Sequence, residues 1–119
     1  MLLVNATPHA INLRNAEGIE TVLPKCETPA RVNVILGVQE DMPEFPCAVF
    51  SADTKGDVID LPAPQAGTFV IVSALVGDAL VAKNIRRHDV LVLGTGPKDG
   101  TIRNAEGHIV AVTRLKRVF

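Results

Sequence analysis

Proline and glycine divide this chain into short apolar runs, and that spacing is the strongest constraint on its fold. The eight prolines and nine glycines lie almost wholly between runs that are rich in valine and isoleucine. Short β-branched runs bounded by turn residues are typical of β-strands. The spacing predicts strands at Leu2–Asn5, His9–Arg14, Ile19–Leu23, Ala30–Leu36, Ala48–Ser51, Val58–Leu61, Phe69–Ser73, Val90–Leu93, Thr101–Arg103 and His108–Leu115.

Helical character is confined to one stretch. Ser73 is a suitable N-cap for a helix over residues 74–82, and Lys83 and the arginines after it suit its C-terminal end. Gly77 lowers the helix propensity there by about 1 kcal/mol relative to alanine. The predicted apolar face consists of Leu75, Val76, Ala79, Leu80 and Ala82. We therefore expect an α+β fold, a predominantly antiparallel β-sheet built from hairpins with one packed helix.

One pentapeptide, Arg-Asn-Ala-Glu-Gly, occurs twice, at residues 14–18 and 103–107. Each copy lies between apolar residues of strand character. Asparagine can hydrogen-bond a turn through its side chain, and glycine accepts the positive φ that closes a short bulged loop. The repeat predicts two β-hairpins with the same loop chemistry. It also places Arg14 and Arg103 at the rim of a sheet, where an arginine can point outward towards a ligand.

Length and charge restrict the class of protein. With 119 residues, the chain matches the common domain size of roughly 100–150, so we expect a single domain over residues 1–119. Residues 1–60 have a net charge of −5 and residues 61–119 a net charge of +4. A pI near 6.3 and the lack of tryptophan and tyrosine argue against binding to long nucleic acid. No apolar run approaches the roughly 20 residues of a membrane span.

Metal and catalytic motifs are missing from the sequence. His9, His88 and His108 are far apart, and Cys26 and Cys47 form neither a disulfide framework nor a metal motif, so we expect no metal and free cytosolic thiols. Ser73 has the strand-to-helix position of an activated serine but lacks the Gly-x-Ser-x-Gly motif, which favours a capping role. No catalytic residue and no cofactor are therefore predicted.

The arginines are the best candidates for a ligand site, because guanidinium groups bind phosphate oxygens in a bidentate manner. Arg31 and Asn33 share one face of a predicted strand, and Arg103 enters the second hairpin turn. The loop at residues 94–100 contains three glycines and a lysine without matching a P-loop, and we predict a flexible lid next to Arg103. The alternative is that each arginine pairs with a nearby acid.

Several segments in order resemble one protein family. The opening VNATPHAIN resembles the "NLTPHAI" start of a group of small phage proteins, the Thoeris anti-defence sponges, which sequester glycocyclic ADP-ribose signals of bacterial TIR-domain immunity. The segments that carry the resemblance are residues 4–12, 30–32, 61–64, 67–76, 87–90 and 103–109. This chain departs from the family pattern with Asn104, where an acid is commoner, and with Leu93-Gly94, where Pro-Gly is usual, which leaves the ligand isomer open.

The resemblance implies a binding protein without catalysis, in the host bacterial cytoplasm. Its ligand would be a cyclic ADP-ribose-type nucleotide, with cyclic trinucleotides as a further ligand of some members, and its assembly a dimer-based homo-oligomer such as a hexamer. Arg31 and Arg103 would meet the pyrophosphate. The predicted ligand-binding set is Arg31, Arg103, Asn104, Asn5, Thr7, His9, Ser73 and Arg87, with Phe50 or Phe69 stacking on a base.

Two other functions fit the sequence. The first is a small phage enzyme that cleaves such a messenger, with His9 or His88 as its base. The second is a non-enzymatic structural or interaction module. Turnover of the ligand distinguishes the first from a sponge, and the lack of any stabilisation by nucleotides distinguishes the second.

Overall fold

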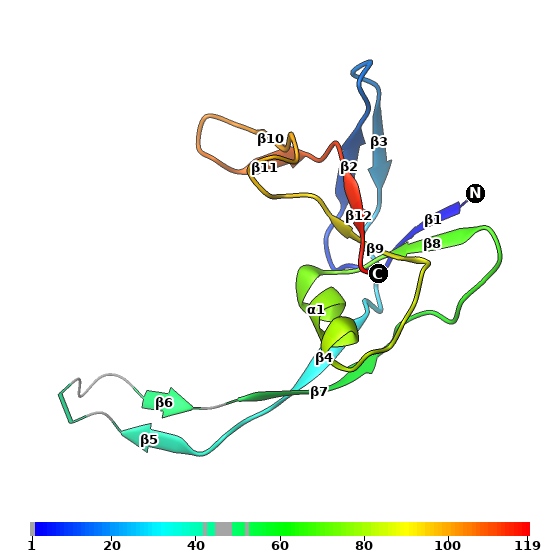
Figure 1. The fold of residues 1–119 in the computed structure, drawn as a ribbon. Coiled ribbons are helices and arrows are strands. Elements are labelled where there is room, and N and C mark those ends of the chain that lie inside the picture. The colour runs from blue at the N-terminus through cyan, green and yellow to red at the C-terminus, as the bar shows by residue number, and fades with distance from the viewer. Residues whose placement is uncertain (1, 42, 45–48, 52) are drawn as a thin grey trace.

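A computed structural model describes residues 2–41, 43–44, 49–51 and 53–119 (Figure 1). It has a central four-stranded sheet covered by one helix, and three two-stranded ribbons that project from this centre. The α+β class with mostly antiparallel hairpin pairing is as predicted. In the described part of the chain no helix is long and apolar enough to cross a membrane.

The central sheet has the order β1-β8-β9-β12. Strands β1 (Leu2–Asn5), β8 (Thr68–Ile71) and β9 (Val90–Leu93) run parallel, and β12 (Leu115–Arg117) pairs antiparallel with β9. The parallel strands are continuous apolar runs, as expected where both faces of a sheet are covered. The helix α1 (Ala74–Ala82) makes the crossover between β8 and β9.

Alternation along these strands produces two apolar clusters. Val70, Val72 and Val90 face α1, where Val76 and Leu80 pack against them. On the other face of the sheet, the second cluster consists of Ile11, Ile71, Leu91 and Val112. The central sheet is thus the best-packed part of the molecule, because its middle strands β8 and β9 have buried residues on both faces.

The helix begins as predicted, since the Ser73 hydroxyl accepts a hydrogen bond from the Val76 N–H at 3.3 Å. Its buried face differs from the prediction: Gly77 is buried, whereas Leu75 and Ala82 are exposed. A Cβ atom on Gly77 would lie 2.9 Å from Val92 Cγ1 of β9. The glycine allows the helix to approach the sheet closely. With Gly77 on the buried face, Leu75 and Ala82 lie at the exposed side of the helix.

Two of the ribbons are short hairpins. One pairs β2 (Ile11–Arg14) with β3 (Glu20–Leu23), and the other pairs β10 (Ile102–Arg103) with β11 (Ile109–Ala111). Figure 1 shows both on the same side of the central sheet. They are joined to each other, because the Arg14 N–H donates to the Val112 carbonyl at 2.9 Å and the Val112 N–H donates to the Asn12 carbonyl at 2.9 Å.

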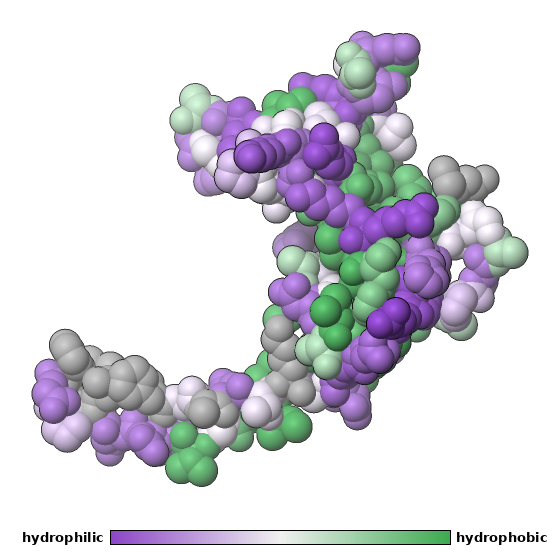
Figure 2. All heavy atoms as spheres, in the orientation of Figure 1, coloured by the Kyte–Doolittle hydropathy of each residue, from purple (hydrophilic) through white to green (hydrophobic). Residues whose placement is uncertain are grey.

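The third ribbon is a long arm on the opposite side of the molecule (Figure 1). It pairs β4 (Arg31–Ile35) with β7 (Thr54–Ile59), and further out β5 (Gln39–Asp41) with β6 (Val49–Ser51). The radius of gyration is 17.2 Å, against roughly 13–14 Å for a compact chain of this length. The molecule is therefore extended, and Figure 2 shows apolar side chains along the outer edge of the arm.

Two strand predictions were clearly wrong in their extent, and one strand was missed. The run His108–Leu115 is two strands, β11 and β12, because the chain leaves one ribbon at Val112 and enters the central sheet at Leu115. Strand β7 begins at Thr54, before the predicted Val58, and β5 was missed because all of its residues are polar. Pairing with β4 and β6 supplies the backbone hydrogen bonds that these polar segments need.

Candidate functional site

The two copies of the repeated pentapeptide form the same turn. The Asn15 side-chain oxygen accepts the N–H groups of Glu17 at 3.0 Å and Ile19 at 2.9 Å. The Asn104 oxygen accepts those of Glu106 and His108, both at 3.0 Å. The closing glycines have φ values of 83° at Gly18 and 84° at Gly107. The prediction of two hairpins with one loop chemistry is confirmed.

The two arginines that enter these turns have different surroundings. Arg14 pairs across its ribbon with Glu20 and forms an ion pair with it. Arg103 pairs across its ribbon with Ile109, which has no charge. Its guanidinium Nη1 donates to the Gly107 carbonyl at 2.9 Å, and no acidic side chain among the described residues forms an ion pair with it. Arg103 is therefore a cation that can still receive an anion.

Arg103 lines a hollow of about 350 Å³ together with the loop that precedes β10. The other residues around this hollow are Thr95, Gly96, Pro97, Gly100 and Thr101. Its walls offer hydroxyl groups, backbone and one guanidinium, which are groups that bind phosphate and ribose oxygens. The predicted proximity of this loop to Arg103 is thus observed.

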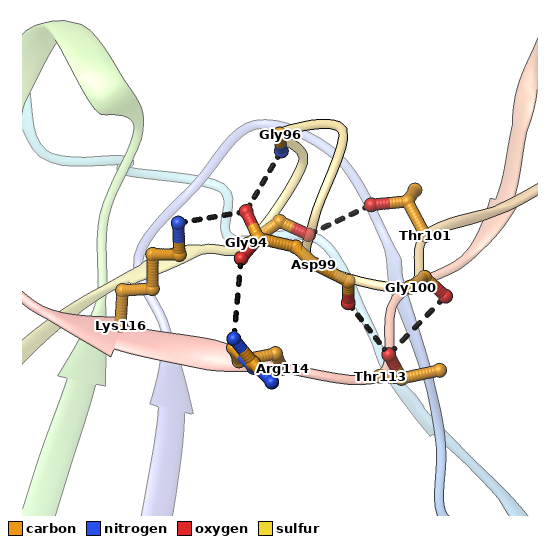
Figure 3. A network of polar contacts seen from close by, with 8 residues as sticks. All are labelled: Gly94, Gly96, Asp99, Gly100, Thr101, Thr113, Arg114 and Lys116. Atoms are coloured by element: carbon orange, nitrogen blue, oxygen red, sulfur yellow. Dashed lines mark hydrogen bonds and ion pairs between the residues drawn. The ribbon is translucent and has the colours of Figure 1, made fainter.

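Asp99 anchors the loop of residues 94–101 to strand β12 (Figure 3). Only 3% of the Asp99 side chain is exposed, and its Oδ2 accepts from Lys116 Nζ at 2.7 Å and from the Gly96 N–H at 2.8 Å. The Arg114 guanidinium lies 3.6 Å from Oδ1. Because Lys116 belongs to the central sheet, these contacts attach the loop to the best-packed part of the molecule.

Hydroxyl groups complete the anchor. Thr113 Oγ1 donates to the Asp99 carbonyl at 2.9 Å, and Thr101 Oγ1 donates to the Gly94 carbonyl at 2.9 Å. A Cβ atom on Gly94 would lie 2.9 Å from the Arg114 carbonyl oxygen, so only glycine fits there. The glycines of this loop, which the sequence suggested were for flexibility, also permit close packing.

The hydrogen bond from Lys116 holds the pKa of Asp99 below its ordinary value, with help from the Gly96 N–H and from the charge of Arg114. Burial of the carboxylate acts in the opposite direction and does not outweigh these contacts. Asp99 is thus an anion at neutral pH, and Lys116 of β12 balances its charge.

Asn5, Thr7 and His9 form a compact turn next to β1. The Asn5 amide donates to the carbonyls of His9 at 2.8 Å and Pro24 at 2.9 Å, and its oxygen accepts from the Thr7 hydroxyl at 2.6 Å. Asn5 and Thr7 are buried, whereas the His9 side chain is exposed. In this structure the polar groups of Asn5 and Thr7 hold strand and turn together.

Ser73 and Arg87 also have partners within the chain. Ser73 caps α1, as described above. Arg87 donates to both carboxylate oxygens of Asp89, at 2.8 and 2.7 Å, and to the Pro62 carbonyl at 2.9 Å. The hydrogen bond between them raises the pKa of Arg87 and lowers that of Asp89. This pair fixes the start of β9 against the loop after β7.

Arg31 stands apart from the hollow at Arg103. It begins β4 at the base of the arm, its side chain is 68% exposed, and its Nε lies 3.8 Å from Asp60 Oδ2. Arg31 is not among the residues that line the hollow at Arg103. Of the eight predicted ligand-binding residues, only Arg103 lines this hollow, and Asn104 follows it in the hairpin turn.

Of the two aromatic candidates, Phe69 does not line the hollow at Arg103. Phe69 packs against the second apolar cluster and borders a separate hollow with Leu3, Leu91 and Leu115. The Phe50 side chain and Cys47 lie outside the described residues. Cys26 is a free thiol. Within the described ranges no group of three or more His, Cys, Asp or Glu side chains is placed to hold a metal ion.

Two features of the site were missed from the sequence, the threonines of the hollow and the Asp99 anchor. Asp99 looked like an ordinary turn acid, because its partners Arg114 and Lys116 follow it by 15 and 17 residues. A weak signal was present in the sequence, since the basic residues Arg114, Lys116 and Arg117 gather in and just before β12, and the glycine-rich loop has a single acid.

Comparisons with protein-family models, with curated proteins and with solved structures give no match for this chain. Function is therefore inferred from the geometry of the site and from the sequence resemblance.

Proposed function

We propose that this protein binds and sequesters a cyclic nucleotide immune messenger of the glycocyclic ADP-ribose type without altering it, and so blocks bacterial anti-phage defence. One observation carries the proposal: Arg103 lines a hollow without an acidic partner among the described residues, whereas Arg14, in the same turn, is paired with Glu20. A guanidinium in this setting suits a phosphate group of the ligand.

A sponge must compete with a receptor, which requires nanomolar affinity, about −12 kcal/mol. Two charge-assisted contacts to phosphate contribute roughly 1.5–3 kcal/mol each, and one stacked base about 1–3 kcal/mol. These contacts fall short, so the ligand has to be enclosed by further protein surface. Arg31 is exposed and distant from the hollow, and we assign it to the pocket of a neighbouring subunit.

Assembly is supported by the arm. Val34, Ile35, Leu36 and Val38 are each more than half exposed, and an isolated two-stranded ribbon is at best marginally stable in water. The acidic first half and the basic second half of the chain complement each other between copies. We therefore expect a homo-oligomer in the host bacterial cytoplasm. The variant Val38→Glu should lower the mass measured by light scattering, while Val22→Glu, at another exposed position, on β3, should not.

Calorimetry against glycocyclic ADP-ribose tests the function. The expected result is binding with submicromolar affinity and recovery of the chemically unchanged ligand after heat denaturation of the protein. Turnover of the ligand would instead support an enzyme. If folded protein fails to bind at micromolar ligand, the proposal is wrong.

A further inference from the structure

We infer that Asp99 is the positioning residue of the anion site at Arg103, holding the loop that shapes the hollow without touching the ligand itself. This inference rests on the proposed function, because it specifies how the same site is built. It concerns residues that the sequence motifs did not single out.

The carboxylate connects a loop to the central sheet. On one side Asp99 Oδ2 accepts from the Gly96 N–H at 2.8 Å, and on the other side from Lys116 Nζ at 2.7 Å. Lys116 is paired with Val92 in the central sheet. A charge-assisted contact of this length is stronger than a neutral hydrogen bond. The position of Gly96 is thereby set by the sheet.

The anchored residues are also the walls of the hollow. Gly96, Gly100 and Thr101 line it together with Arg103, and Gly96 is bonded directly to the Asp99 carboxylate. Thr113 Oγ1 contacts the carbonyls of Asp99 at 2.9 Å and Gly100 at 3.2 Å. The Thr101 hydroxyl donates to the Gly94 carbonyl and so joins the two ends of the loop. These hydroxyl bonds go to backbone carbonyls, so loss of the carboxylate would change the shape of the hollow through Gly96 (Figure 3).

Charge placement gives the anchor a second effect. The Asp99 carboxylate is directed towards Lys116 and Arg114 on the β12 side of the loop, and Figure 3 shows these contacts on the side away from Thr101. An anion in the hollow therefore meets Arg103, while the negative charge of Asp99 is matched by its own partners. A preorganised loop also lowers the entropic cost of ordering the site around a ligand.

The experiment measures loop protection and affinity in the same variants. Hydrogen exchange of ligand-free protein follows the amides of residues 94–101, and calorimetry uses two probes, inorganic pyrophosphate and glycocyclic ADP-ribose. Asp99→Asn should speed exchange in the loop at least tenfold and weaken binding of both probes at least tenfold at a temperature where the variant is fully folded. Lys116→Met keeps the Asp99 carboxylate as the acceptor for the Gly96 N–H and should give smaller changes in the same direction. It replaces Asp99→Asn as the test variant if Asp99→Asn does not fold.

Glu20→Gln is the matched control, since it removes one charge from an ion pair of the other hairpin and should leave both readouts unchanged. Unchanged affinity in Asp99→Asn, with only a lower melting temperature, would show that Asp99 is merely structural and overturn the inference alone. If the wild type binds pyrophosphate but not the cyclic nucleotide, the proposed function fails while the inference is still decided by the pyrophosphate data. A wild type that binds neither probe overturns both.

Discussion

The hairpins β2–β3 and β10–β11 have turns of the same geometry, and they differ in the residue that pairs with their arginine on the opposite strand. In both turns the asparagine oxygen accepts two N–H groups and the glycine has a φ near 84°. Across the ribbon, Arg14 meets Glu20 and Arg103 meets Ile109. The comparison teaches that a turn motif sets where an arginine is presented, whereas the cross-strand residue decides whether its charge is available.

The turns themselves should respond alike to loss of the asparagine. Asn15→Ala and Asn104→Ala each remove an acceptor for two N–H groups, and at about 0.5–1.5 kcal/mol per hydrogen bond we expect a loss of roughly 1–3 kcal/mol of unfolding free energy. Chemical denaturation measures both. Only Asn104→Ala should also weaken ligand binding, because only that turn presents an available arginine. A large stability difference between the two variants would contradict the equivalence of the turns.

A single substitution should make the second hairpin behave like the first. Ile109 is exposed and lies opposite Arg103, so Ile109→Glu supplies the acid that Glu20 supplies to Arg14. We expect a tenfold or greater loss of affinity for glycocyclic ADP-ribose, which equals about 1.4 kcal/mol. Ile109→Gln is the uncharged control and should bind nearly as well as the wild type. Equal losses in both variants would mean that shape and not charge is responsible.

Low pH should loosen the loop of residues 94–101, which precedes the β10–β11 hairpin in the chain. The pKa of Asp99 is lowered by Lys116, with Gly96 and Arg114 contributing. A carboxylate with a lowered pKa stabilises the fold above its unfolded pKa of about 3.9, and this stabilisation is lost as the pH falls through the lower, folded value. The protection of the amides of residues 94–101, corrected for the pH dependence of the intrinsic exchange rate, should therefore be unchanged from pH 7 to pH 5 and be lost below about pH 4. Asp99→Asn should remove this pH dependence.

The smallest effect is expected for the ion pair of the first hairpin. Arg14 and Glu20 are partly exposed, and surface ion pairs contribute about 0–1 kcal/mol. Glu20→Gln should lower the unfolding free energy by less than 1 kcal/mol and should create no anion site, because Arg14 lacks the glycine-rich loop that lines the hollow at Arg103. Measurable pyrophosphate binding gained by this variant would show that an unpaired arginine in this turn is sufficient.

Local features of the fold were predictable from the sequence. The N-cap at Ser73, the bounds of β1 and β9 and the twin turns depend on residues close to one another in the chain. The parallel pairing of β1 with β8 and the polar strand β5 depend on partners far away in sequence, and periodicity does not report them. The buried position of Gly77 follows from the approach of the helix to Val92, which no helical pattern reveals.

The candidate site shows the same division. The outward position of Arg103 followed from the turn motif, whereas its hollow and the Asp99 anchor arise from contacts between the loop, β10 and β12. Arg31 and Arg103 were expected to meet one pyrophosphate, and within one chain they lie at separate places. In the proposed oligomer, Arg31 of one subunit would lie at the pocket of Arg103 of a neighbouring subunit. Contacts between subunits of this kind are not predictable from the sequence of one chain.

The most direct measurement is a pair of calorimetric titrations of Arg103→Ala and Arg14→Ala with glycocyclic ADP-ribose. We predict that Arg103→Ala weakens binding more than tenfold, and that Arg14→Ala, which removes the same side chain from the same turn, binds like the wild type. Equal affinities in the two variants would contradict the assignment of Arg103 as the anion-binding group.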